Sequence, residues 1–164
     1  MLLDLKDIFV SDGACKDVSY ELSMSEVDIA GEYPFDSPVK VAAHVENKAG
    51  MVSLDISAAF VYSTVCCRCL APIEREFDQH FSHKLIETLE EDYNDDYIEA
   101  PELSLDLDAL VSSDILLELP SRFLCRRDCQ GLCQKCGHNL NLGKCGCDTE
   151  EIDPRLEALK ELLK

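Results

Sequence analysis

The chain has 164 residues, ten cysteines and a formal net charge of −18, a size that suits one domain or a domain with a small appended metal-binding module. So strong a negative charge opposes nonspecific attraction to nucleic-acid phosphate, because such attraction depends on lysine and arginine side chains that displace counterions. The sequence lacks a run of about 18 apolar residues, which a membrane span requires, and the basic start of a secretory signal, so we expect a cytoplasmic protein.

The first part of the chain predicts short strands and an irregular segment. Residues 1–24 are expected to form one or two strands, interrupted by a turn at Ser11–Gly13. The apolar side of these strands is expected to comprise Leu3, Leu5, Ile8 and Val10. Glycine and proline punctuate residues 25–38, which favours an irregular connection to the next element.

The next stretch has the period of β-strands. Apolar and polar residues alternate over 39–46 and again over 52–60, and the residues 47–50 between them suit a hairpin turn. We therefore predict an antiparallel pair with one buried face. His44 falls on the polar face and is expected to be solvated. A third strand is predicted after Pro72, with one side formed by Ile73, Phe77 and Phe81.

The stretch that follows is strongly acidic. From Glu87 to Glu118 the chain holds twelve acidic residues and no lysine or arginine. We predict a loop over 88–104, whose acids either face solvent or bind a basic partner. Asp106 and Asp108 are not expected to act as an acid–base pair, because no nucleophile, histidine or phosphate-binding loop accompanies them.

Two helices are predicted in the second half of the chain. Apolar residues at helical spacing indicate an amphipathic helix from Asp106 to Leu119 that packs across the sheet, capped by Ser104 or Asp106 and ended by Pro120. A last helix is expected to begin at Asp153-Pro154 and to dock its leucine side on the core. The predicted fold class is therefore α+β: an antiparallel β-meander or sheet with a packed helix, followed by a C-terminal cysteine-rich zinc-binding module and a short helix.

Residues 121–148 form the cysteine-rich segment. Within it, Cys133-x-x-Cys136 is followed after eight residues by Cys145-x-Cys147. A Cys-x-x-Cys turn places two sulfurs on one side of a tight loop, within reach of a tetrahedral ion about 2.3 Å from each sulfur. The glycine that follows the first pair suits the positive φ of such a turn. We therefore predict a first zinc site with the ligands Cys133, Cys136, Cys145 and Cys147.

A second metal site requires ligands that lie far apart in the sequence. Two cysteines of the segment, Cys125 and Cys129, are not used by the first site. Another Cys-x-x-Cys pair lies at the tip of the predicted hairpin, between the second and third strands. We predict that these two pairs meet in a second zinc site with the ligands Cys66, Cys69, Cys125 and Cys129. Cys15 and Cys67 are then left over.

The same thiols permit other arrangements. A single site can also be drawn from Cys129, Cys133 and Cys136 with one of Cys145, Cys147 and His138. The expected cofactor is thus zinc, as one or two ions. An iron–sulfur cluster fits less well, because both proposed sets are compact and closed. Redox-active thiols are a further alternative, whereas structural disulfides are not expected in a reducing cytoplasm.

The cysteine-rich segment is also locally basic. Between residues 122 and 147 there is one acid, Asp128, against five basic side chains: Arg122, Arg126, Arg127, Lys135 and Lys144. A tetrathiolate zinc site carries about two negative charges, so part of this excess can neutralise the sites. The same five residues are the candidate contacts to RNA or to another partner. The metal site that fixes the backbone beside Lys135 and Lys144 would present those two side chains rigidly.

Several motifs stand in an order that resembles one known family. They are Cys66-Cys67-Arg68-Cys69-Leu70-Ala71-Pro72, Glu118-Leu119-Pro120, residues 129–141, Cys145-Gly146-Cys147 and Asp153-Pro154-Arg155-Leu156. The sequence is similar to the YceD family, the large ribosomal RNA subunit accumulation proteins of bacteria and chloroplasts, with residues 1–164 as one domain of this type. The resemblance implies a non-enzymatic cytoplasmic factor that supports accumulation or processing of large-subunit ribosomal RNA and ribosome assembly.

Three classes of function are consistent with the sequence. The first is a zinc-binding assembly factor that contacts a precursor of large-subunit ribosomal RNA. The second is an acidic module that binds a basic ribosomal protein through the acids of residues 87–118, without direct RNA contact. The third is a thiol redox protein. A hydrolytic zinc enzyme is not expected, because catalytic zinc keeps an open coordination position, and neither a membrane nor a small-molecule substrate is expected as a partner.

Overall fold

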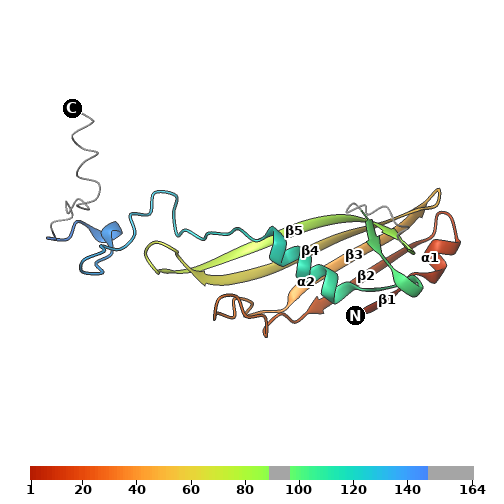
Figure 1. The fold of residues 1–164 in the computed structure, drawn as a ribbon, viewed down its shortest axis with the longest axis horizontal. Helices are drawn as coiled ribbons and strands as arrows, with labels where there is room; N and C mark the ends of the chain where they lie inside the picture. Colours follow the sequence, from red (N-terminus) through yellow and green to blue (C-terminus); the bar gives the residue numbers. More distant parts are fainter. Residues whose placement is uncertain (89–96, 148–164) are drawn as a thin grey trace, which may run out of the picture. The chain divides into compact units, whose positions relative to one another are not determined.

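The structure, a computed structural model, describes residues 1–88 and 97–147 (Figure 1). Its elements run in the order β1 (Leu2–Asp4), α1 (Lys6–Val10), β2 (Cys15–Leu22), β3 (Val39–Lys48), β4 (Met51–Val65), β5 (Pro72–Ile86), β6 (Tyr97–Glu99), the 3₁₀ turn η1 (Pro101–Leu103), β7 (Ser104–Asp106), α2 (Leu107–Glu118) and the 3₁₀ turn η2 (Leu140–Leu142). The described fold is mostly β. The chain divides into two compact units. The first unit comprises Met1–Thr64 and Ile73–Arg122, and the second comprises Val65–Pro72 and the chain from Phe123.

A five-stranded sheet forms the body of the first unit, in the order β2-β3-β4-β5-β6 (Figure 1). The strands β2, β3 and β4 pair antiparallel, and the alternating sequence predicts the β3–β4 pair. In contrast, β5 and β6 pair in parallel, with Leu85 opposite Ile98. The sheet is therefore mixed, and the prediction of a wholly antiparallel sheet was wrong at this edge. A strand of three residues is too short for an alternation of apolar and polar residues to reveal it.

The β3–β4 hairpin closes with a tight turn where the sequence predicts one. Ala49 and Gly50 both have positive φ, at 53° and 83°, as the two central residues of a type I′ turn do. Asn47 supports the turn from the core, because its Oδ1 accepts the N–H of Gly50 at 3.0 Å. Its Nδ2 donates to the carbonyl of Ile8 at 2.7 Å. This buried amide therefore links the hairpin to α1.

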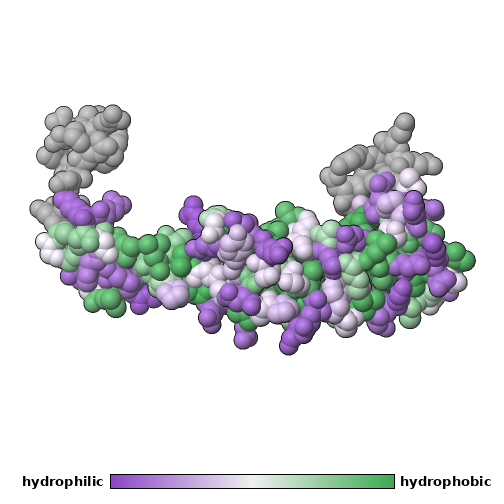
Figure 2. Space-filling view, turned by 90° about the horizontal axis from the view of Figure 1, so that it is seen from below, coloured by the Kyte–Doolittle hydropathy of each residue, from purple (hydrophilic) through white to green (hydrophobic). Residues whose placement is uncertain are grey.

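One face of the sheet is buried. Val45 lies opposite Leu54 across the β3–β4 pair, and both side chains are buried. A polar contact also joins β5 to the helix α2: Nε2 of His83 on β5 lies 2.8 Å from Oδ2 of Asp114 on α2. Hydrophilic residues are interspersed with hydrophobic ones over the molecular face shown in Figure 2.

Helix α2 confirms the predicted helix. Its N-cap is Asp106, whose Oδ1 accepts the backbone N–H groups of Asp108 at 3.2 Å and Ala109 at 3.4 Å. The helix buries one side, formed by Leu107, Val111 and Ile115. It ends at Glu118, shortly before Pro120, as the sequence predicts, because proline cannot continue a helix. The second predicted helix, from Asp153, lies outside the described residues.

The prediction for the N-terminus was partly wrong. β1 and β2 are strands and a turn follows α1, but Lys6–Val10 is a short helix instead of extended chain. Leu5 and Ile8 are buried as predicted, whereas Val10 is 81% exposed. Residues three apart in a helix share a face, so Leu5 and Ile8 both point inward and Val10 turns outward.

The acidic stretch is also more ordered than predicted. The part of 88–104 from Tyr97 onward forms β6, η1 and the start of β7. β7 pairs antiparallel with β1, and Leu105 lies opposite Leu3. The predicted loop was therefore wrong for these residues, while positions 89–96 lie outside the described part of the chain.

Candidate metal centres

The second unit gathers four cysteines from two distant segments, which we call the bridging cluster: Cys66, Cys69, Cys125 and Cys129. The Sγ atoms of Cys66 and Cys129 are 3.8 Å apart, and those of Cys69 and Cys125 are 3.6 Å apart. All four sulfurs lie within 4.8 Å of one another. A disulfide would require about 2.05 Å. Sulfurs at the corners of a tetrahedron around an ion 2.3 Å away are separated by about 3.8 Å. The spacing therefore suits one tetrahedral ion.

A second group, which we call the local cluster, comes from one short stretch: Cys133, Cys136, Cys145 and Cys147. Its four sulfurs also lie within 4.8 Å of one another. The structure thus brings together the same two sets of four that the spacing suggests. Cys129 belongs to the other cluster and the exposed His138 to neither, which contradicts the single-site arrangement. The two left-over cysteines, Cys15 and Cys67, are exposed and outside both clusters.

The two Cys-x-x-Cys turns share one backbone geometry. In the bridging cluster, the N–H of Leu70 donates to the carbonyl of Cys66 at 2.9 Å, and in the local cluster Gly137 donates to Cys133 at 2.8 Å. The residue after the second cysteine has positive φ in both turns, at 59° for Leu70 and 72° for Gly137. The sequence predicts this conformation for Gly137. Leu70 adopts it with a side chain, at a cost of about 1–2 kcal/mol.

Three contacts join the two segments of the bridging cluster. The guanidinium Nη1 of Arg68 donates to the carbonyl of Cys129 at 2.8 Å. The carbonyl of Arg68 accepts the N–H of Leu132 at 3.1 Å, and the N–H of Cys67 donates to the carbonyl of Phe123 at 2.9 Å. These contacts of Arg68 were not predicted from the sequence. The only feature that hints at them is the position of the arginine inside a Cys-x-x-Cys motif, where the turn fixes the backbone.

A buried thiol in each cluster has a lowered pKa. Backbone N–H groups, that of Cys125 first, lower the pKa of Cys66 to about 6. The N–H groups of Cys136 and Lys135 lower the pKa of Cys133 to about 6. These two side chains are only 0% and 3% exposed. A low thiol pKa combined with so little solvent exposure is more typical of a metal ligand than of a thiol that exchanges disulfides, because a redox-active thiol must be accessible to its substrate.

The pKa of another thiol in the local cluster is raised. Its hydrogen bond with the sulfur of Cys136 raises the pKa of Cys147 to about 12. Four thiolates so close together repel one another, so they cannot all ionise without a cation among them. A bound metal ion would supply that charge, and its binding would release protons.

Comparison with known proteins identifies the family. A family model described as "Large ribosomal RNA subunit accumulation protein YceD" matches residues 54–163, which is more than half of the chain and includes both clusters. The chain belongs to the YceD family. Among the described residues, no helix has the length and apolarity needed to cross a membrane.

Curated relatives of this YceD-family chain come from bacteria and plants. An uncharacterized protein of Mycobacterium tuberculosis is 33% identical over 102 residues, which cover 60% of this chain and 49% of that protein. The large ribosomal RNA subunit accumulation protein YCED homolog 1, chloroplastic, of Arabidopsis thaliana is 28% identical over 152 residues, covering 74% and 47%. YlbN of Bacillus subtilis is 28% identical over 130 residues, covering 78% and 76%. The chain spans about half the length of the first two relatives, and no solved structure matches it.

The candidate contact residues of this YceD-family chain are all exposed: Arg122, Arg126, Arg127, Lys135 and Lys144. Arg122 belongs to the first unit and the other four to the second. Arg126 has a structural role, because its guanidinium donates to Asn141 Oδ1 at 2.7 Å and lies 3.6 Å from a carboxylate oxygen of Asp128. Arg126 is therefore held in one orientation by its own unit.

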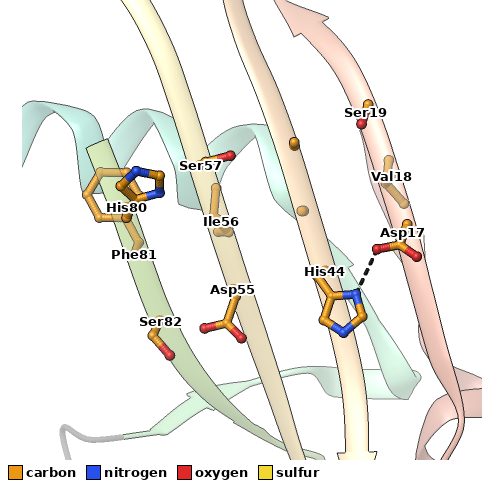
Figure 3. A pocket seen from close by; sticks show the side chains of 12 residues that line it. Asp17, Val18, Ser19, His44, Asp55, Ile56, Ser57, His80, Phe81 and Ser82 are labelled. Atoms are coloured by element: carbon orange, nitrogen blue, oxygen red, sulfur yellow. Dashed lines mark hydrogen bonds and ion pairs between the residues drawn. The ribbon is translucent and has the colours of Figure 1, made fainter. Parts of the chain in front are cut away.

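A hollow of about 470 Å³ lies on the outer side of the sheet in the first unit (Figure 3). Its lining includes His44 from β3, Asp17 from β2 and Asp55 from β4. The Nδ1 of His44 lies 2.7 Å from Asp17 Oδ1, and this hydrogen bond raises the pKa of His44 above its ordinary value. His44 is half-exposed, as the sequence predicts. Within the described residues, only the two cysteine clusters group three or more ligand atoms closely enough for an ion.

Proposed function

We propose that both clusters bind zinc, one ion each, with Cys133, Cys136, Cys145 and Cys147 as the ligands of one ion and Cys66, Cys69, Cys125 and Cys129 as the ligands of the other. Two observations support zinc: the donors are all thiolates, and the sulfur spacing suits a single tetrahedral ion. Four protein ligands close the coordination shell, which is the arrangement of structural zinc and leaves no position for substrate. The sites would therefore stabilise the second unit, and the protein would not be an enzyme.

The function that these observations favour is a cytoplasmic, non-enzymatic factor for large-subunit ribosomal RNA accumulation, processing and ribosome assembly. The single observation that carries it is the YceD family match, which spans both clusters. The name of the Arabidopsis relative refers to accumulation of the large ribosomal RNA subunit. The partner would be a large-subunit ribosomal RNA precursor, contacted through the exposed basic residues of the zinc-bearing segment. Zinc-fixed turns would lower the entropy lost when those residues become ordered on RNA.

Co-sedimentation tests this function. Purified large-subunit precursor particles should carry the protein through a sucrose gradient at low salt, and binding should weaken as salt rises, because phosphate contacts release counterions. Lys135→Glu with Lys144→Glu should reduce binding. The control, Lys6→Glu with Lys48→Glu, changes two exposed lysines of the first unit and so makes the same change in net charge. Equal loss in both variants would show that net charge alone decides, and wild-type protein absent from the particles at low salt would exclude the proposal.

A second candidate function is an acidic module that binds a basic ribosomal protein. Of the acids proposed from sequence, Asp106 caps α2, Asp108 contacts the Met1 amino group and Asp114 contacts His83. These carboxylates are therefore already paired within the first unit. The outer side of the sheet offers a second acidic surface.

Three hollows follow one another on that outer side of the sheet, since neighbouring hollows share lining residues. They are lined by one lysine, Lys40, and by five acids: Asp17, Glu21, Asp55, Glu76 and Asp78. This sign of charge favours a lysine- or arginine-rich protein segment over RNA. Neutralising Glu21, Glu76 and Asp78 as amides should weaken binding to a basic large-subunit protein in the absence of RNA. Neutralising Glu99 and Glu102 in the acidic stretch instead would test the surface expected from sequence.

A further inference from the structure

Asn141 connects the two clusters. By sequence it belongs to the local cluster, because it lies between that cluster's two cysteine pairs. Its side-chain Nδ2 nevertheless donates a hydrogen bond to the sulfur of Cys129, a ligand in the bridging cluster, at 3.3 Å. Its Oδ1 accepts the backbone N–H of Gln130 at 2.8 Å and the guanidinium of Arg126 at 2.7 Å. Two donors facing Oδ1 fix the orientation of the amide, and its N–H group must then face the sulfur.

The loop that carries Asn141 folds back on the chain between the clusters. The N–H of Leu140 donates to the carbonyl of Gly131 at 2.9 Å, and Leu132 and Asn139 form an antiparallel bridge. The Oδ1 of Asn139 accepts both the backbone N–H of Asn141 at 3.0 Å and its side-chain amide at 2.7 Å. The position of Asn141 therefore depends on the folded shape of this loop.

The local cluster closes this loop. An ion bound by the cysteine pairs at both ends would cross-link the stretch and remove most of its conformational freedom. Without that ion, the chain would lose entropy each time it held Asn141 against Cys129. The hydrogen bond itself stabilises negative charge on the Cys129 sulfur, because hydrogen bonds to an ionised acceptor are stronger than neutral ones.

We propose that the clusters bind metal cooperatively: an ion in the local cluster positions Asn141, and Asn141 then strengthens metal binding in the bridging cluster. This inference rests on the proposed metal-binding function and adds to it an energetic coupling between the two clusters. Asn141 is a positioning residue, since it touches a ligand and not the ion. Removing such an outer partner of a metal ligand typically lowers metal affinity by about 10- to 100-fold. Because coupling between sites is reciprocal, an ion in the bridging cluster also strengthens binding in the local cluster.

The test is a zinc titration of the reduced, metal-free full chain against a chromophoric chelator. Asn141→Ala is compared with wild type and with Leu142→Ala, a control at the neighbouring residue, whose side chain is 81% exposed. Variants that lack one cluster, Cys66→Ser with Cys69→Ser or Cys145→Ser with Cys147→Ser, assign each affinity to its site. Far-UV circular dichroism checks that each variant keeps its sheet.

The expected result is two ions in wild type and in Leu142→Ala. Asn141→Ala should bind the bridging ion about 10- to 100-fold more weakly. Its affinity for the local ion should change far less. Loss of the local cluster should weaken the bridging ion by a similar factor, and adding Asn141→Ala to that variant should then change little. If Asn141→Ala weakens both ions equally or neither, the coupling is wrong although metal binding stands. If wild type takes up no ion, the coupling and the proposed metal-binding function both fail.

Discussion

Replacing Gly131 by alanine tests whether the bridging cluster depends on close approach of its two segments. Gly131 has a φ of 75°, and a Cβ added there would lie 3.1 Å from the carbonyl oxygen of Arg68. That oxygen accepts the N–H of Leu132, so it cannot move away without weakening a bond between the segments. The positive φ costs alanine about 1–2 kcal/mol and the weakened bond about 0.5–1.5 kcal/mol. The total of about 1.5–3.5 kcal/mol corresponds to roughly 10- to 300-fold in metal affinity.

Gly137→Ala is the matched control. Its φ is 72°, and no atom lies within 4 Å of an added Cβ, so it carries the φ cost without the contact. The expected loss of binding free energy is about 1–2 kcal/mol. It should weaken metal binding in the local cluster first. Chelator competition should therefore show Gly131→Ala releasing the bridging ion first and more readily than Gly137→Ala does. If Gly131→Ala holds that ion as tightly as the control does, or loses only the local ion, then close approach at Gly131 does not support the bridging cluster.

Four further outcomes are expected. Leu70→Gly should raise the melting temperature of the metal-loaded protein, because glycine adopts positive φ with about 0.5–1 kcal/mol less strain after its own entropy cost; an unchanged or lower value would contradict this. Asn47→Ala should lower the free energy of unfolding by about 1–3 kcal/mol in a denaturant titration, since it leaves buried partners unpaired. Asp17→Asn should move the pKa of His44, followed by NMR, down toward its ordinary value. In wild type the Asp17–His44 contribution to stability is present below the ordinary pKa of histidine and is lost as pH rises through the raised pKa of His44. Cys136→Ser, or removal of metal by a chelator, should unfold the second unit while the strand signal in circular dichroism persists; full loss of that signal would contradict separate stabilisation of the two units.

Local patterns predicted much of the first unit. Alternation placed β3 and β4 correctly, because each is long enough for period two to be visible and has one buried face. Asp106 and Pro120 set the bounds of α2 through capping and helix termination, both of which depend on neighbouring residues only. β6 was missed because three residues cannot show a period, and α1 was missed because its single turn buries only Ile8.

The spacing of the cysteines suggests how they group, but it does not reveal the side-chain contacts that hold the groups together. A Cys-x-x-Cys motif fixes the positions of two sulfurs by local geometry, and each cluster contains one such motif. The other two cysteines of each cluster could then be sought among the remaining thiols. Arg68 and Asn141 act across the second unit, through contacts to Cys129 that no local pattern encodes. Asparagine tolerates turn conformations, and this is the only local signal at Asn141. Its contact with the Cys129 sulfur depends on how the loop folds back over Gly131.

Metal content per chain decides whether both clusters hold metal. Protein purified without added metal is analysed for bound elements. Free thiols are counted in the folded protein before chelation, and again under denaturing conditions after chelation. Eight of the ten cysteines belong to the clusters, which leaves Cys15 and Cys67, both exposed. We expect two zinc ions per chain, two reactive thiols before chelation and ten after it. Ten reactive thiols and no bound metal at the outset would contradict it.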